Sequence, residues 1–146
     1  MTTIRTATAA DLPAIYDLVT ELAIYEKEPD AVVATLEDYQ RDFAEDVFEC
    51  QVAEQDGKVI GMTLYYLTYS TWRGKMLYLE DFVVSQSHRR TGAGELLFDR
   101  VLEVAKQKNC RLLKWQVLDW NEPALNFYAK YNATIEKDWW NGKIIF

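Results

Sequence analysis

The chain has 146 residues, which is room for one domain, because domains typically hold roughly 100 to 200 residues. Its apolar share of 49% and charged share of 27% are typical of a globular protein and argue against disorder. With 16 Lys and Arg against 23 Asp and Glu, the net charge is −7. An acidic protein repels phosphate backbones and anionic lipids, so nucleic acid and membrane partners are disfavoured and small cationic ligands are favoured.

The cysteines and the single histidine suggest neither a metal site nor a covalent nucleophile. Cys50 and Cys110 lie in apolar runs without a Cys-x-x-Cys spacing, so we expect reduced core thiols. His88 is the only histidine, so no metal centre and no Ser–His or Cys–His hydrolase chemistry is expected. The N-terminus lacks a signal-peptide stretch, and no run approaches the ~20 apolar residues of a membrane span. We therefore expect a soluble, cytoplasmic protein.

The first half of the chain predicts two helices and then a run of strands. Leu12, Ile15, Val19 and Leu22 repeat at helical spacing, with Asp11 as a plausible cap. Further along, polar and apolar residues alternate, and Asp-Gly at 56–57 is a hairpin signal. The predicted elements in chain order are a strand at 4–6, a helix at 11–25, a short helix after residue 35, and strands at 48–52, 59–69 and 76–84.

The second half predicts strand–helix–strand units. Its predicted elements are a helix at 94–108, a strand at 112–117, a helix that Asn121 caps, a left-handed stop at Asn132, and a last strand at 144–146. No repeat or flexible linker interrupts the sequence, so residues 1–146 are expected to form a single domain. This order of elements predicts an α/β or α+β protein with helices on both faces of a sheet.

The most informative segment joins the strand end Leu79-Glu80-Asp81-Phe82-Val83-Val84 to a basic loop that opens a helix. A helix start offers free backbone N–H groups and a positive dipole end, which suit phosphate, and Gly92 and Gly94 let the backbone approach a ligand. Arg89 and Arg90 add positive charge. The alternative is a solvated loop whose glycines only cap the helix.

Known phosphate loops differ in how well they match this segment. A Walker loop is absent, and a dinucleotide fingerprint would need a third glycine where Leu97 stands. The spacing Arg89-x-x-Gly92-x-Gly94 resembles the pyrophosphate loop of the GNAT N-acetyltransferases. Three further blocks are similar to the spermidine/spermine (diamine) and thialysine N-acetyltransferases: Glu21-Leu22-Ala23-x-Tyr25-Glu26, Tyr78-Leu79-Glu80-Asp81-Phe82-x-Val84 and Trp120-Asn121-Glu122-Pro123-Ala124-x-Asn126-Phe127-Tyr128.

This resemblance implies a GNAT fold with a mixed sheet of about six to seven strands, and direct transfer of acetyl from acetyl-CoA to an amine. By resemblance, the residues that bind acetyl-CoA are Phe82, Val83, Val84, Arg89, Arg90, Thr91, Gly92, Ala93, Gly94, Glu95, Asn121, Glu122, Pro123 and Ala124. Those that contact the amine are Tyr25, Glu26 and Glu80 and, by a looser match, Lys114, Trp115 and Gln116. Asp81 is added to them because its charge, with those of Glu26 and Glu80, would create a negative cleft for a second amine. Arg90 and Thr91 stand where the diamine enzymes often carry Gly and an apolar residue, and are expected to tune cofactor affinity.

Amine acetylation requires two proton transfers, and the sequence offers a residue for each. A primary amine with a pKa near ~10 is a cation at pH 7 and must lose a proton before it attacks a carbonyl. Glu80, near the end of a strand, is expected to accept that proton, directly or through water. The leaving thiolate needs a proton as well, and the match of Tyr128 to the Asn-x-Phe-Tyr block implies that this phenol is the proton donor. Alternatively, one of Glu80 and Asp81 faces solvent while the other pairs with an arginine, and Tyr128 is a packing residue among nine tyrosines.

The predicted function is acetyl transfer to a primary amine of a small diamine, polyamine or lysine-like molecule. Alternatives are another acceptor (an amino acid, an aminoglycoside-like compound or a protein N-terminus) and a non-catalytic acyl-CoA-binding module. The resemblance also implies a homodimer.

Overall fold

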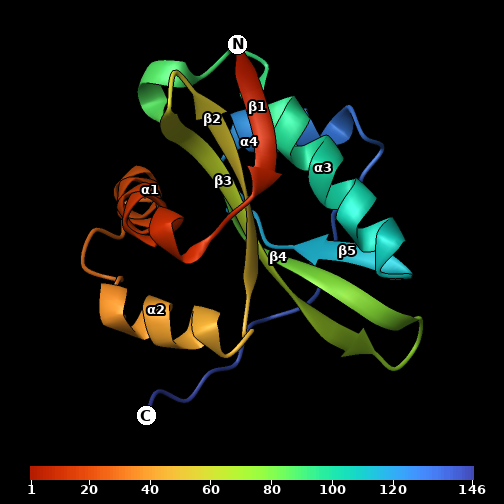
Figure 1. Cartoon of the computed structure of the whole chain (residues 1–146). Coiled ribbons are helices and arrows are strands. Elements are labelled where there is room, and N and C mark those ends of the chain that lie inside the picture. The colour runs from red at the N-terminus through yellow and green to blue at the C-terminus, as the bar shows by residue number, and fades with distance from the viewer. The chain divides into compact units, whose positions relative to one another are not determined.

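The computed structural model describes residues 1–146 (Figure 1). The chain divides into two units, Met1–Gln116 and Val117–Phe146. The first unit holds one five-stranded sheet in the order β1-β2-β3-β4-β5. β1 to β4 pair antiparallel with their neighbours, and β4 and β5 run parallel. The strands are β1 (Thr2–Thr6), β2 (Glu49–Gln55), β3 (Lys58–Ser70), β4 (Gly74–Val84) and β5 (Leu112–Trp115).

Helices cover both faces of this sheet, as the sequence predicts. α1 (Leu12–Tyr25) and α2 (Leu36–Ala44) pack on one face, and α3 (Ala93–Gln107) packs on the other (Figure 1). α1 buries one stripe made of Leu12, Ile15, Leu18 and Val19, which confirms its predicted periodicity. The α/β class is therefore confirmed.

Local signals explain where several elements begin and turn. Thr35 and Asp38 form a reciprocal capping box that starts α2, with the Asp38 N–H donating to Thr35 Oγ1 and the Thr35 N–H donating to the Asp38 carboxylate. Asp56 and Gly57 both have positive φ, which confirms the predicted hairpin turn. Asp11 does not cap α1 with its side chain; its carboxylate instead accepts hydrogen bonds from the Thr8 N–H and from Arg5.

The predicted strand count is too high. Residues 144–146 form no strand, and Ile144 and Ile145 are 84% and 81% exposed. A strand needs a partner to accept and donate its backbone hydrogen bonds, and the second unit, whose helix is α4 (Glu122–Ala129), contains no strand. A short apolar run at a chain end is thus insufficient evidence for a strand. The single domain over residues 1–146 stays a prediction.

The structure shows neither a metal-ligand cluster nor a membrane-spanning helix. No group of three or more His, Cys, Asp or Glu side chains is placed to hold a metal ion. None of the helices combines the length and apolar character that crossing a membrane requires. Both cysteines are free thiols, Cys50 buried and Cys110 half-buried, as expected.

Gly61 on β3 lets α3 approach the sheet next to the end of β4. A Cβ at this position would lie 3.0 Å from the carbonyl oxygen of Val83, 3.1 Å from Leu97 Cδ1 and 3.3 Å from the Cα of Val84. Two of these three atoms belong to the backbone and cannot rotate away.

We therefore expect Gly61→Ala to lower the free energy of unfolding by about 1–3 kcal/mol, as overpacked cores do. Urea unfolding measures this change. Gly142→Ala is the matched control, because nothing lies within 4 Å of the added Cβ there, and its effect should stay within about 1 kcal/mol. Equal stability of the two variants would contradict the close packing of α3 on Gly61.

Candidate active site

The candidate site begins where β4 loses its parallel partner. β5 pairs with β4 only from Met76 to Leu79, whereas β4 continues to Val84. No strand pairs with β4 on this side at Phe82, Val83 and Val84. Backbone contacts to a ligand are the role that the sequence resemblance assigns to these three residues.

A β-bulge lies at the same place. In the pairing with β3, Leu79 is opposite Tyr65 and Asp81 is opposite Leu64, so Glu80 is the extra residue on β4. A bulge bends a strand and redirects its side chains, and such irregularities are frequent beside active sites. Here it brings two consecutive carboxylates to the point where the parallel ladder ends.

Glu80 is exposed and held by a tyrosine. The Tyr66 hydroxyl donates a 2.8 Å hydrogen bond to Glu80 Oε1, and the Tyr66 ring stacks on Tyr78 with centroids 5.5 Å apart. Burial and the neighbouring Glu80 carboxylate raise the pKa of Tyr66. Glu80 therefore keeps an oriented, solvent-accessible carboxylate, which suits a proton acceptor.

Asp81 is more buried, and it is the most perturbed carboxyl group of the chain. Burial, followed by the negative charges of Glu80 and Glu26, raises the pKa of Asp81 from 3.8 to about 7. Burial also raises the pKa of Glu26, which ends α1. The first unit thus brings the predicted residues Glu26, Glu80 and Asp81 together as a negative cluster.

The basic loop has the geometry of an anion site. Gly92 is the N-cap residue of α3; its φ of 87° lies in the left-handed region, and it has no side chain to cap the first turn. A Cβ added to Gly92 would meet nothing within 4 Å, so the backbone faces open space. Arg89 and Arg90 are exposed beside it. Arg90 itself has a φ of 65°, a conformation that glycine adopts more easily.

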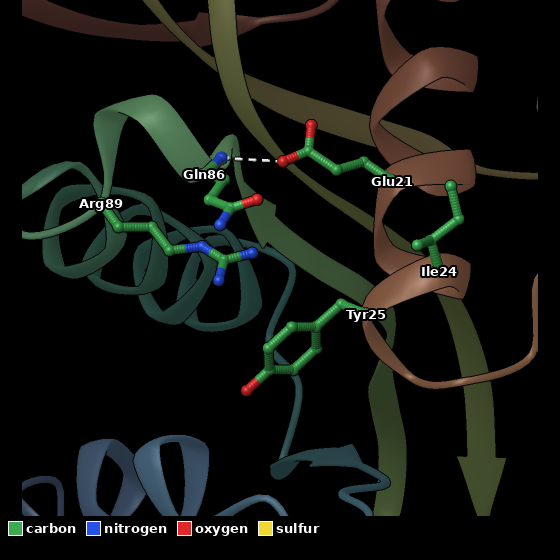
Figure 2. A pocket seen from close by; sticks show the side chains of 5 residues that line it. All are labelled: Glu21, Ile24, Tyr25, Gln86 and Arg89. Atoms are coloured by element: carbon green, nitrogen blue, oxygen red, sulfur yellow. Dashed lines mark hydrogen bonds between the residues drawn. The ribbon is translucent and has the colours of Figure 1, made fainter.

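A pocket of ≈ 360 Å³ lies between the end of α1 and this loop, lined by Glu21, Ile24, Tyr25, Gln86 and Arg89 (Figure 2). The Arg89 guanidinium lies over the Tyr25 ring, 5.0 Å from its centroid. The sequence resemblance assigns Tyr25 and Arg89 to different ligands, the amine and acetyl-CoA, and here they touch each other. Glu21 and Gln86 are not among the predicted site residues, although Glu21 belongs to a block that carries the family resemblance.

The predicted residues on β5 point in different directions. Trp115 packs its ring edge on Phe98 of α3, with centroids 5.6 Å apart, and Phe98 stacks on Phe82. Lys114 is exposed and stands opposite Tyr78 in the parallel register. Gln116 follows the strand and is exposed. Trp115 thus belongs to the packing on the α3 face, whereas Lys114 lies on the same face as Tyr78.

The second unit holds the remaining predicted residues. Asn121 caps α4, with the Ala124 N–H donating to Asn121 Oδ1 at 3.2 Å, and Pro123 stands in the first turn as expected. Tyr128 is 7% exposed and meets the Phe127 ring edge-on at a centroid distance of 5.6 Å. Asn132 has a φ of 57°, which confirms the predicted left-handed stop.

Comparison with known proteins decides the family. The profile of the Acetyltransferase (GNAT) family matches residues 12–133. The chain belongs to this family. The enzyme class predicted from the sequence, an N-acetyltransferase, is confirmed with it.

Individual proteins of known name and structure are similar to this chain. The thialysine N-epsilon-acetyltransferase of Bos taurus is 41% identical over 140 residues, which are 89% of this chain and 82% of that protein. The spermidine/spermine N(1)-acetyltransferase-like protein 1 of Homo sapiens is 37% identical over 139 residues, and this chain spans only 20% of its length. A solved aminoglycoside acetyltransferase from an uncultured soil metagenomic sample has a TM-score of 0.82 at 19% identity, covering 99% of this chain and 96% of that one, which shows the shared fold.

The raised pKa of Asp81 predicts how the stability of the GNAT unit depends on pH. The folded pKa of about 7 exceeds the unfolded value, so the folded chain binds more protons between about pH 4 and 7. Stability should therefore fall as the pH rises through this window. We expect Asp81→Asn to abolish this part of the dependence and to be more stable than wild type at pH 8 by up to about 4 kcal/mol.

Urea unfolding of both proteins at pH 5 and pH 8 measures the effect. Asp17→Asn is the matched control, because Asp17 is exposed on α1 and loses the same charge. An unchanged pH dependence in Asp81→Asn would contradict the electrostatic account of this carboxyl group.

Proposed function

We propose that this GNAT enzyme transfers the acetyl group of acetyl-CoA to a primary amine of a small diamine, polyamine or lysine-like molecule. The cluster of Glu26, Glu80 and Asp81 carries this proposal. Three carboxyl groups at one place attract a cation, and an acceptor with a second amine has a charge to satisfy there. The relatives named for thialysine and for spermidine/spermine support the same class.

The residues of the loop fit the binding of acetyl-CoA. Its pyrophosphate would be held by the uncapped first turn of α3, from Ala93 to Glu95, and by Arg89, Arg90 and Thr91. Its pantetheine arm and acetyl group would lie against the backbone of Phe82, Val83 and Val84, where β4 has no parallel partner. Asn121, Glu122, Pro123 and Ala124 are proposed to complete cofactor binding on the strength of their match to the family block. Acetyl-CoA supplies the activated thioester.

Two residues, Glu80 and Tyr128, are proposed to carry out the proton transfers. Glu80 accepts the proton of the ammonium group, directly or through water, and the neutral amine then attacks the thioester carbonyl. A nitrogen–carbon bond forms, the carbon–sulfur bond breaks, and Tyr128 gives a proton to the sulfur. The acylated nitrogen then loses its second proton, which returns to the Tyr128 oxygen through solvent, so the net proton released is the one that Glu80 accepted. Glu26 and Asp81 hold the second cationic group of the acceptor. The open position of Glu80, fixed by Tyr66, supports its role as the base.

Two alternatives to this function differ in whether acetyl transfer takes place at all. Another amine, such as an amino acid, an aminoglycoside-like compound or a protein N-terminus, would use the same base and acid. A non-catalytic acyl-CoA-binding module would need neither Glu80 nor Tyr128. Three statements from the sequence remain predictions: that the protein forms a homodimer, that it is cytoplasmic, and that the acceptor contacts Lys114, Trp115 and Gln116.

Tyr128→Phe tests the acid. We expect kcat to fall by roughly a hundredfold or more, because a positioned general acid contributes typically 10²–10⁴-fold. Binding of acetyl-CoA, measured by calorimetry, should persist. Tyr131→Phe is the control, since it removes a phenol from the same unit. Unaffected turnover in Tyr128→Phe would overturn the proton-donor assignment.

A thiol-release assay tests the acceptor class. Wild-type enzyme with acetyl-CoA is offered putrescine, spermidine, spermine, lysine, thialysine and a peptide N-terminus. We expect release with the diamines, polyamines or lysine-like amines, and an increase of at least tenfold in acceptor KM in Glu26→Gln, because one carboxylate of the cluster is lost. Release with the peptide alone would overturn the acceptor class and keep the acetyltransferase.

A further inference from the structure

We propose that Glu21 is a positioning residue for the acetyl-CoA loop, because its carboxylate holds the turn from Gln86 to Arg89 against the C-terminal end of α1. This inference rests on the proposed function of the loop. Glu21 belongs neither to the residues proposed to bind acetyl-CoA nor to those proposed to contact the amine. Its effect on the reaction would be indirect, through the position of the loop that follows β4.

The contact itself is a short charge-assisted hydrogen bond. The Gln86 backbone N–H donates to Glu21 Oε1 at 2.7 Å (Figure 2). Gln86 is the first residue of the 3-10 turn Gln86–His88, and the first N–H groups of such a turn have no partner inside it. Glu21 therefore caps this turn from another element, and hydrogen bonds to an ionised carboxylate are roughly twice as strong as neutral ones.

The same helix holds the other end of the turn. Tyr25 follows Glu21 by one helical turn on the same face of α1, and the Arg89 guanidinium lies on its ring. The Arg89 Nε also donates to the carbonyl of Val84 at 3.3 Å. Figure 2 shows Glu21 directed at the Gln86 N–H and Arg89 directed toward Tyr25. The segment between Val84 and Arg89 is thus fixed at both ends.

The position of this segment matters because only three residues, Arg90 to Gly92, separate it from the first turn of α3. Arg90 and Gly92 have left-handed backbones, and they lead into that turn. The N–H groups of the turn can bind a pyrophosphate only if the loop presents them in the right place, and fixing a loop in its binding conformation lowers the entropy cost of binding. Glu21 supplies part of that fixation without touching the ligand.

Glu21→Ala tests the inference, with two thioesters as donors. Acetyl-CoA carries the pyrophosphate, and S-acetyl-N-acetylcysteamine is a truncated donor that lacks it. We expect Glu21→Ala to weaken acetyl-CoA binding, measured by calorimetry, and to raise the KM for acetyl-CoA, both by about five- to tenfold, with kcat within twofold of wild type. With the truncated donor, kcat/KM should be unchanged.

Two further variants separate positioning from a general structural effect. Glu21→Gln keeps an oxygen that can accept from the Gln86 N–H, so it should restore most of the acetyl-CoA affinity. Asp17→Ala removes an exposed carboxylate one turn earlier on α1 and should leave the KM for acetyl-CoA unchanged. Thermal unfolding of each variant shows whether it is folded at the assay temperature. Binding and kinetics are measured at a temperature at which every variant is folded.

Three results would contradict the positioning role of Glu21, and they are distinguishable from one another. Equal losses with acetyl-CoA and with the truncated donor would overturn the positioning role, since the pyrophosphate would not be involved. Unchanged acetyl-CoA affinity in Glu21→Ala would overturn it as well and leave the proposed function intact. A wild-type chain that does not bind acetyl-CoA would overturn the proposed function and this inference together.

Discussion

The separation of β4 from β5 is the constraint on which the rest of the first unit depends. Up to Leu79, β4 is hydrogen-bonded to a strand on each side, and beyond it only to β3. The sheet leaves the second edge of Phe82 to Val84 without a strand because β5 ends at Trp115. The bulge at Glu80 occurs at the same position. One local interruption of the sheet thus leaves this edge of β4 without a neighbouring strand, close to two consecutive carboxylates.

The acidic cluster of Glu26, Glu80 and Asp81 is unfavourable for folding, and this points to a functional reason for it. Asp81 is buried enough to raise its pKa to about 7, and its charge also contributes to the raised pKa values of Tyr39 and Cys50, after burial. The two charged neighbours that act on the pKa of Asp81 are themselves carboxylates, Glu80 and Glu26. A buried carboxyl group with carboxylate neighbours destabilises the folded chain, and such groups concentrate at functional sites. Core stability gives no reason for an aspartate here, whereas binding a cation does.

The sequence predicts most of the elements because their signals are local. Helix α1 follows from apolar residues three and four apart, as does α2, which carries Leu36, Tyr39 and Phe43. The hairpin follows from Asp56-Gly57, and each signal lies within one short window. The bulge at Glu80 is not predictable in this way, because it depends on the register between Leu64 and Asp81. The contact of Glu21 with Gln86 joins residues 65 positions apart, so no local pattern reports it. The strand predicted at 144–146 is wrong because a pairing partner is also a non-local requirement.

The charges of the first unit follow from the two ligands proposed for it. A net charge of −7 attracts an amine but repels acetyl-CoA, whose phosphates are anionic. Glu80 and Asp81 precede Phe82 to Val84 along the chain, and Arg89 and Arg90 follow, so the strand end separates a negative region from a positive one. Arg90 keeps a left-handed backbone that costs a non-glycine residue roughly 1–2 kcal/mol. Glycine would remove this cost but also the charge, so an arginine at this position is consistent with a loop that must attract an anion to an acidic protein.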